Sequence, residues 1–157
     1  MGLAMSRRAV LDYLLAIARI SIGVIYIYAS LDKLAQPDKF SIAVSYYQFL
    51  PDPLINLWAL AMPAVELAVG LFLVLGIFVK PSSLLVMLMS LSFVIAVTRA
   101  WAIGLDIDCG CFRQDGSGSN ITLLTVLRDT GLFMLCLVLW LFHNGSLGLG
   151  RLIKALR

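Results

Sequence analysis

The chain has 157 residues, of which 61% are hydrophobic and only 13% charged, and its mean hydropathy is +0.98. A soluble domain carries roughly a quarter charged residues, so this composition excludes a water-facing globular surface. It predicts a single integral membrane domain over residues 1–157, with the lipid bilayer as its surroundings. The net charge of +3 does not indicate nucleic-acid binding, because the positive residues lie at the ends of apolar segments and instead indicate orientation in the membrane.

Four apolar segments are long enough to cross a bilayer, which takes about 20 helical residues. The link between the second and third segments is very short and centred on Lys80-Pro81-Ser82, so these two helices form a hairpin. Pro81 suits the first turn of the third helix. The expected fold class is therefore an all-α membrane protein, an antiparallel four-helix transmembrane bundle. Its predicted spans cover about residues 11–33, 54–79, 83–105 and 121–143.

A short helix is expected between the first two spans. The segment Phe40 to Leu50 is too short to cross the membrane and ends at Pro51-Asp52-Pro53. Its aromatic residues suit the boundary between membrane and water, so we expect an interfacial helix over the outer end of the bundle. These aromatic residues are Phe40, Tyr46, Tyr47 and Phe49.

The distribution of charge predicts which way the bundle faces. Four spans place both termini on one side, and this side carries Arg7, Arg8 and Lys80 together with a basic tail. By the positive-inside rule the termini are cytoplasmic, in a bacterial inner membrane. The first span is long for a signal peptide and has no convincing cleavage site, so we expect it to be retained. The loop between the third and fourth spans then faces the periplasm.

That loop contains Cys109-Gly110-Cys111, in the one strongly polar stretch of the chain. Two thiols separated by one glycine can close a small ring, and a disulfide in so small a ring is expected to be strained and readily reduced. The alternative is a static disulfide that pins the loop, but a small ring restricts the unfolded chain little. We therefore interpret Cys109 and Cys111 as a redox pair. Three cysteines are too few for a structural zinc site, which typically needs about four ligands, and the single histidine excludes a haem held by two histidines of this chain.

Charged residues inside the spans are the next candidates, because an intramembrane charge must face the bundle interior, water or headgroups. Arg99 and Arg128 each lie about 9 Å inside the outer end of a span. They would stabilise a thiolate or bind a quinone oxygen, or else extend to the membrane surface with Asp129 or Asp106 as a partner. We keep both interpretations, with Arg99 and Arg128 as the candidate cofactor-binding residues.

Glu66 is the deepest charge, on the same helix face as Pro63 and Gly70, so it is expected to point into the bundle. Arg19 on the first helix is its expected partner, in an ion pair that locks the first two helices; the alternative role for Glu66 is proton relay. Lys33 is expected to cap the end of the first helix or to meet headgroups. Cys136, which shares a stripe with Asp129 and His143, is expected to pack as a small hydrophobic residue.

These residues resemble a known family. The patterns Arg19…Gly23…Ser30-Leu31-Asp32-Lys33…Pro37 and Pro63-Ala64-Val65-Glu66…Gly70 are similar to those of the DoxX superfamily of small four-helix membrane proteins. The block Asp108-Cys109-Gly110-Cys111-Phe112 followed by Leu127-Arg128-Asp129 resembles its methylamine utilisation protein MauE branch, over roughly Arg19 to Phe142. Asp129 departs from the asparagine that relatives tend to carry, and Ser30 from glycine.

The resemblance implies thiol-disulfide metabolism outside the cytoplasm, in support of disulfide formation in secreted redox enzymes, with thioredoxin-like partners. We therefore expect Cys109 and Cys111 to exchange electrons with such a partner, in one version with a quinone near Arg99 and Arg128. Arg19, Lys33, Glu66 and Asp129 would support this site. One alternative is a non-catalytic membrane anchor or accessory subunit of a redox complex, in which the Cys109–Cys111 disulfide is structural. A carrier of small sulfur species is another.

Overall fold

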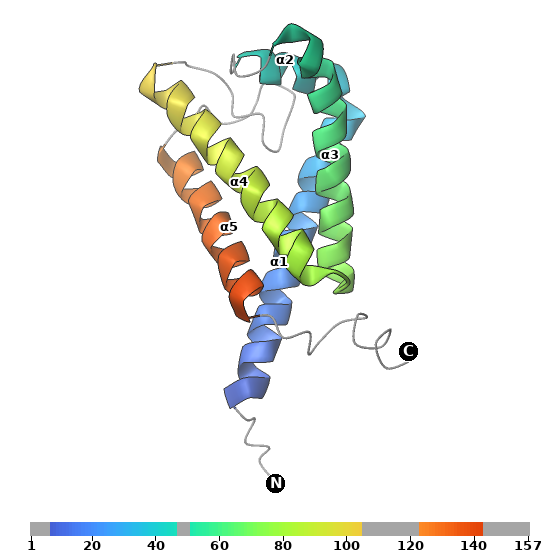
Figure 1. Ribbon diagram of the computed structural model, residues 1–157, viewed down its shortest axis with the longest axis vertical. Coiled ribbons are helices and arrows are strands. Elements are labelled where there is room, and N and C mark those ends of the chain that lie inside the picture. The colour runs from blue at the N-terminus through green and yellow to red at the C-terminus, as the bar shows by residue number, and fades with distance from the viewer. Residues whose placement is uncertain (1–6, 47–50, 105–122, 143–157) are drawn as a thin grey trace.

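The structure is a computed structural model that describes residues 7–46, 51–104 and 123–142, and these are helical apart from short turns (Figure 1). Three of its helices contain segments long and apolar enough to cross a membrane, Val10–Ala35, Pro53–Leu75 and Val79–Arg99. These are the helices of a multi-pass membrane protein, and they overlap the first three predicted spans. The described ranges contain five helices, α1 (Arg7–Ala35), α2 (Pro37–Tyr46), α3 (Asp52–Leu75), α4 (Val79–Ala102) and α5 (Leu123–Phe142).

The outer faces of these helices are apolar. Leu57, Leu60 and Ile17 are 60% or more exposed, which would be unfavourable for a helix surface in water. In a bilayer the same faces contact acyl chains. The interior is correspondingly small, and its centre includes Ile22, Leu73 and other aliphatic side chains that are fully buried.

The helices associate as two pairs, α3 mainly on α1 and α5 mainly on α4. Figure 1 shows α3 and α4 joined by a tight turn at one end and separating toward the other end. The beginning of α1 and the end of α5 lie at the same end of the bundle as this turn. The opposite end carries α2, which packs on α3.

The turn between α3 and α4 lies earlier than predicted, at Gly76–Phe78 and not at Lys80–Ser82. Gly76 has φ 71°, a left-handed conformation that glycine adopts without steric cost. Its N–H donates to the carbonyl of Leu73, and the next N–H, of Ile77, donates to Phe72. This double closure is a common helix ending. Pro81 lies in the first turn of α4, as predicted.

Helix α2 lies where the short helix was expected and begins at Pro37, three residues before the predicted start, because proline fits the first turn of a helix. Its aromatic residues do not share one environment. Tyr46 is 55% exposed, whereas Phe40 is 7% exposed and packs inward, so Phe40 contacts the bundle and not the surroundings of the helix. Tyr47 and Phe49 lie outside the described residues.

Helices α1 and α3 cross with their backbones in close contact. A Cβ atom added to Gly70 would lie 2.9 Å from the carbonyl oxygen of Gly23, and one added to Gly23 would lie 2.8 Å from that of Gly70. Small residues permit this approach, which maximises van der Waals contact where no hydrophobic effect drives helices together. The crossing fixes the register of α1 against α3.

We expect Gly70→Ala to weaken this crossing, with a loss of about 1–3 kcal/mol in unfolding free energy, as is typical of overpacked cores. Gly131→Ala on α5 is the matched control, because an added Cβ meets no atom within 4 Å there. The control is expected to be neutral or to gain up to about 1 kcal/mol from helix propensity. Detergent-titrated unfolding followed by circular dichroism measures both, and equal stabilities of the two variants would refute the close crossing.

Candidate functional site

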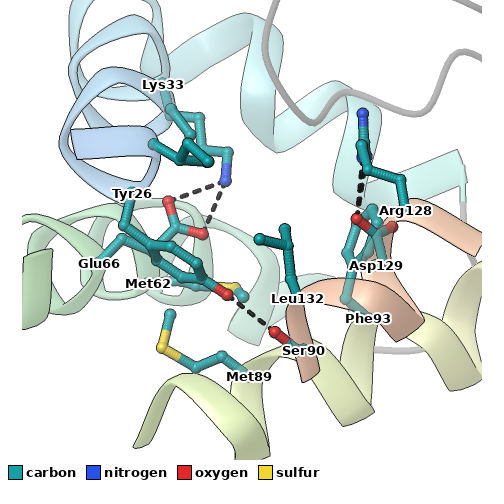
Figure 2. A pocket seen from close by; sticks show the side chains of 12 residues that line it. Tyr26, Lys33, Met62, Glu66, Met89, Ser90, Phe93, Arg128, Asp129 and Leu132 are labelled. Atoms are coloured by element: carbon teal, nitrogen blue, oxygen red, sulfur yellow. Dashed lines mark hydrogen bonds and ion pairs between the residues drawn. The ribbon is translucent and has the colours of Figure 1, made fainter. Parts of the chain in front are cut away.

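A cavity of about 60 Å³ lies between α1, α3, α4 and α5, and its lining combines apolar side chains with charged and hydroxyl groups. We call it the polar cavity after these groups. This volume suffices for a few water molecules, since roughly 10–15 Å³ holds one. Figure 2 shows an ion pair at one side of the cavity and a carboxylate with its arginine at the other. Its polar lining residues are Tyr26, Lys33, Glu66, Ser90, Arg128 and Asp129.

The ion pair joins Lys33 of α1 to Glu66 of α3. Lys33 Nζ donates to both carboxylate oxygens, at 2.7 Å and 2.8 Å, and the two side chains are 8% and 7% exposed. The ring of Phe40 from α2 lies 5.2 Å from Nζ, within the range of a cation–π contact. Either charge alone would be costly to bury, so each residue holds the other in place.

Glu66 therefore points into the bundle as predicted, but its partner is not Arg19, and Lys33 neither caps its helix nor meets headgroups. The register explains the correction. Gly70 packs against Ile27, and from this level Lys33 lies about 9 Å and Glu66 about 6 Å toward the same end. Arg19 lies about 12 Å in the opposite direction. Side chains tilt toward the N-terminus of their helix, so that Lys33 and Glu66 lean together, whereas Arg19 leans away.

Arg19 is nevertheless buried, at 4% exposure. Its Nε and Nη1 atoms have no hydrogen-bond partner in the part of the chain that the structure describes. Arg19 is separate from the cavity and does not line it. No contact of Arg19 with the cavity therefore supports its expected role at the site.

A second polar contact crosses the cavity from α1 to α4, where the hydroxyls of Tyr26 and Ser90 lie 2.8 Å apart. Sequence reasoning missed both residues. The missed signal is a seven-residue repeat, because Arg19, Tyr26 and Lys33 are spaced so that they lie on one face of α1. Ser90 lies between Met89 and Leu91 on α4 and offers no comparable periodic signal.

Asp129 of α5 completes the polar lining. Nε and Nη2 of Arg128 each lie 3.1 Å from Asp129 Oδ1. Asp129 was one of the two partners expected for the arginines from the sequence. Asp129 is 6% exposed, and no described residue donates to its buried Oδ2. One carboxylate oxygen therefore remains available to a ligand or a water molecule.

The other predicted site residues lie elsewhere. Arg99 is exposed on α4 and does not line the cavity, so the structure does not bring it together with Arg128 there. Cys109, Cys111 and His143 lie outside the described residues. Cys136 is fully buried in the aliphatic core, which confirms its expected packing role. Among the described residues no three side chains of the metal-binding types gather at one place.

The comparisons with known proteins give the family. The family model described as "Methylamine utilisation protein MauE" matches residues 11–142. The chain belongs to the MauE family. Its sequence is 33% identical over 122 residues to the methylamine utilization protein MauE of Paracoccus denitrificans. The alignment covers 77% of this chain and 65% of that protein. This chain thus spans about two thirds of its relative's length, and no solved structure matches it.

The buried pair gives a direct test of this MauE-family site. We expect Lys33→Met or Glu66→Leu alone to cost about 3–5 kcal/mol, because each leaves an uncompensated buried charge. The double variant should recover most of that loss, since apolar residues of similar volume replace the pair. A double-mutant cycle on thermal unfolding in detergent measures the coupling, and additive losses would show that the two charges do not depend on each other.

Proposed function

We propose that this protein is a membrane thiol-disulfide redox protein, in which Cys109 and Cys111 exchange electrons with a thioredoxin-like partner. The observation that carries the proposal is the position of Cys109-Gly110-Cys111 in the sequence. It lies between α4 and α5, two helices whose side chains line the cavity that holds the paired lysine and glutamate. Membership of the MauE family supports a role in a methylamine utilisation system, through disulfide formation in secreted redox enzymes.

The proposed chemistry uses one cysteine pair. In the oxidised protein, a partner thiolate attacks the Cys109–Cys111 bond, a mixed disulfide forms, and the second partner thiol resolves it. The partner leaves with a disulfide, and Cys109 and Cys111 are left as two thiols. Strain in the small ring favours this direction, because it makes the ring disulfide the better oxidant.

A quinone is the proposed oxidant that restores the pair. Two S–H bonds break and one S–S bond forms, so two electrons and two protons leave the thiols and convert the quinone to a quinol. Arg99 and Arg128 were the candidate quinone ligands. The proposal retains Arg128 as a quinone ligand, because it lines the cavity. It assigns no contact with the quinone to Arg99, which is exposed on α4.

The membrane arrangement belongs to the same proposal. We place α5 across the bilayer as the fourth span, with the termini cytoplasmic and the Cys109–Cys111 loop periplasmic in a bacterial inner membrane. The common end of α1 and α5 in Figure 1 fits four antiparallel spans, and the distribution of lysine and arginine supports the orientation. A wider relationship to the DoxX superfamily remains part of this proposal.

Alkylation trapping in intact cells tests the redox role. We expect the native pair to be found in both oxidation states. In Cys111→Ala, the Cys109 thiolate can still attack an oxidised partner, and we expect the mixed disulfide to accumulate because Cys111 is no longer there to complete this reverse exchange. Cys136→Ala is the matched control and should behave like the native protein, since Cys136 is buried in the core. A pair that stays fully oxidised in the presence of reductant and partner would instead identify a structural disulfide in an accessory subunit.

A further inference from the structure

A second hollow, of about 250 Å³, lies outside the cavity between α3 and α4. Almost all of its lining is apolar, and we call it the α3–α4 groove; its residues include Trp58, Ala61, Val65, Leu88 and Ser92. It lies where α3 and α4 separate from their common turn, on helix faces that would contact lipid. An apolar groove on this surface is accessible to molecules dissolved in the bilayer.

The groove and the polar cavity share two lining residues, Met62 of α3 and Met89 of α4. Both side chains are partly buried, and Figure 2 shows them beside Tyr26 and Ser90. Methionine is unbranched and adopts many rotamers, so it can move without disturbing the helices. The two methionines therefore form a deformable wall between an apolar groove and a polar cavity.

The wall lies too deep for a phospholipid headgroup, so a phospholipid would place only an acyl chain in the groove and no head in the polar cavity. Met62 lies ten residues after the start of α3, and Met89 ten residues after the start of α4. Each is about 15 Å from the end of its helix, which is the middle of a hydrocarbon core about 30 Å thick. A phospholipid headgroup stays at the membrane surface, whereas a quinone head dissolves in the interior.

The charge of the cavity also favours a neutral head. Two cations, Lys33 and Arg128, face two carboxylates, Glu66 and Asp129, so the lining has no net charge to attract an anion. It does supply hydroxyl, ammonium and carboxylate groups that bind carbonyl and hydroxyl oxygens. Asp129 Oδ2 has no donor among the described residues, and it can accept a hydrogen bond from a quinol hydroxyl.

We propose that the α3–α4 groove binds the tail of an isoprenoid quinone, whose head passes between Met62 and Met89 into the polar cavity. The inference rests on the quinone version of the proposed function. It gives the quinone a specific entry path from the bilayer and assigns no role to Arg99. The electron donors are the two thiols of Cys109 and Cys111, as balanced above. Binding itself does not need them.

Quinone binding is measured in purified protein that carries Cys109→Ser and Cys111→Ser, so that the result does not depend on thiol chemistry. Trp101→Phe and Trp140→Phe leave Trp58, in the groove, as the fluorescent reporter. Decylubiquinone is the probe, and we expect saturable quenching of Trp58. Ala61→Phe and Ser92→Phe fill the groove from opposite walls and should weaken binding about tenfold or more, equivalent to losing about 1.4 kcal/mol.

Ala64→Phe is the matched control, because Ala64 is exposed on the same helix but does not line the groove. Equal affinities of the Ala61→Phe, Ser92→Phe and Ala64→Phe variants, or quenching that never saturates, would overturn the proposal. The two failures are distinguishable. If the thiols proved inert but the groove still bound the quinone, only the proposed redox function would be refuted. If the thiols cycled between oxidation states but the groove bound no quinone, only the proposed groove site would be refuted.

Discussion

The buried ion pair of Lys33 and Glu66 is the constraint on which the rest of the structure depends. A lysine and a glutamate inside an apolar bundle are tolerated only as a bonded pair, and their 2.7 Å contact joins α1 to α3. Phe40 covers the ammonium group, so the pair also fixes how α2 packs over the bundle. Retaining two charges at this depth costs more than replacing them with leucine would, which is why we connect them with function.

Helix geometry then determines what surrounds the pair. The close approach of Gly23 and Gly70 makes α1 and α3 a tight unit. Helices α4 and α5 form the second unit, and α4 diverges from α3 beyond their common turn. The space left between the units is polar inside, where Tyr26, Ser90 and Asp129 face the ion pair, and apolar outside. One arrangement thus places hydrogen-bonding groups next to a lipid-facing groove.

Much of the fold follows from the sequence, because hydropathy alone reveals long apolar helices and the Pro63–Glu66–Gly70 spacing shows which face is buried. The partner of Glu66 did not follow, since a choice between Arg19 and Lys33 depends on the register of two helices, and that register depends on backbone contact between glycines. Gly76 was overlooked as a turn because the apolar residues Ile77 and Phe78 follow it. The Tyr26–Ser90 contact required the three-dimensional placement of α4 against α1.

The central claim is that the polar cavity serves the chemistry of Cys109 and Cys111. The most direct measurement is the rate at which added decylubiquinone oxidises the reduced cysteine pair, in the native protein and in the folded Lys33→Met/Glu66→Leu variant. The account predicts a slowing of about tenfold or more in the variant, the equivalent of one lost hydrogen bond to a charged group. Equal rates in the two proteins would contradict it, because the cavity would then have no part in the electron transfer.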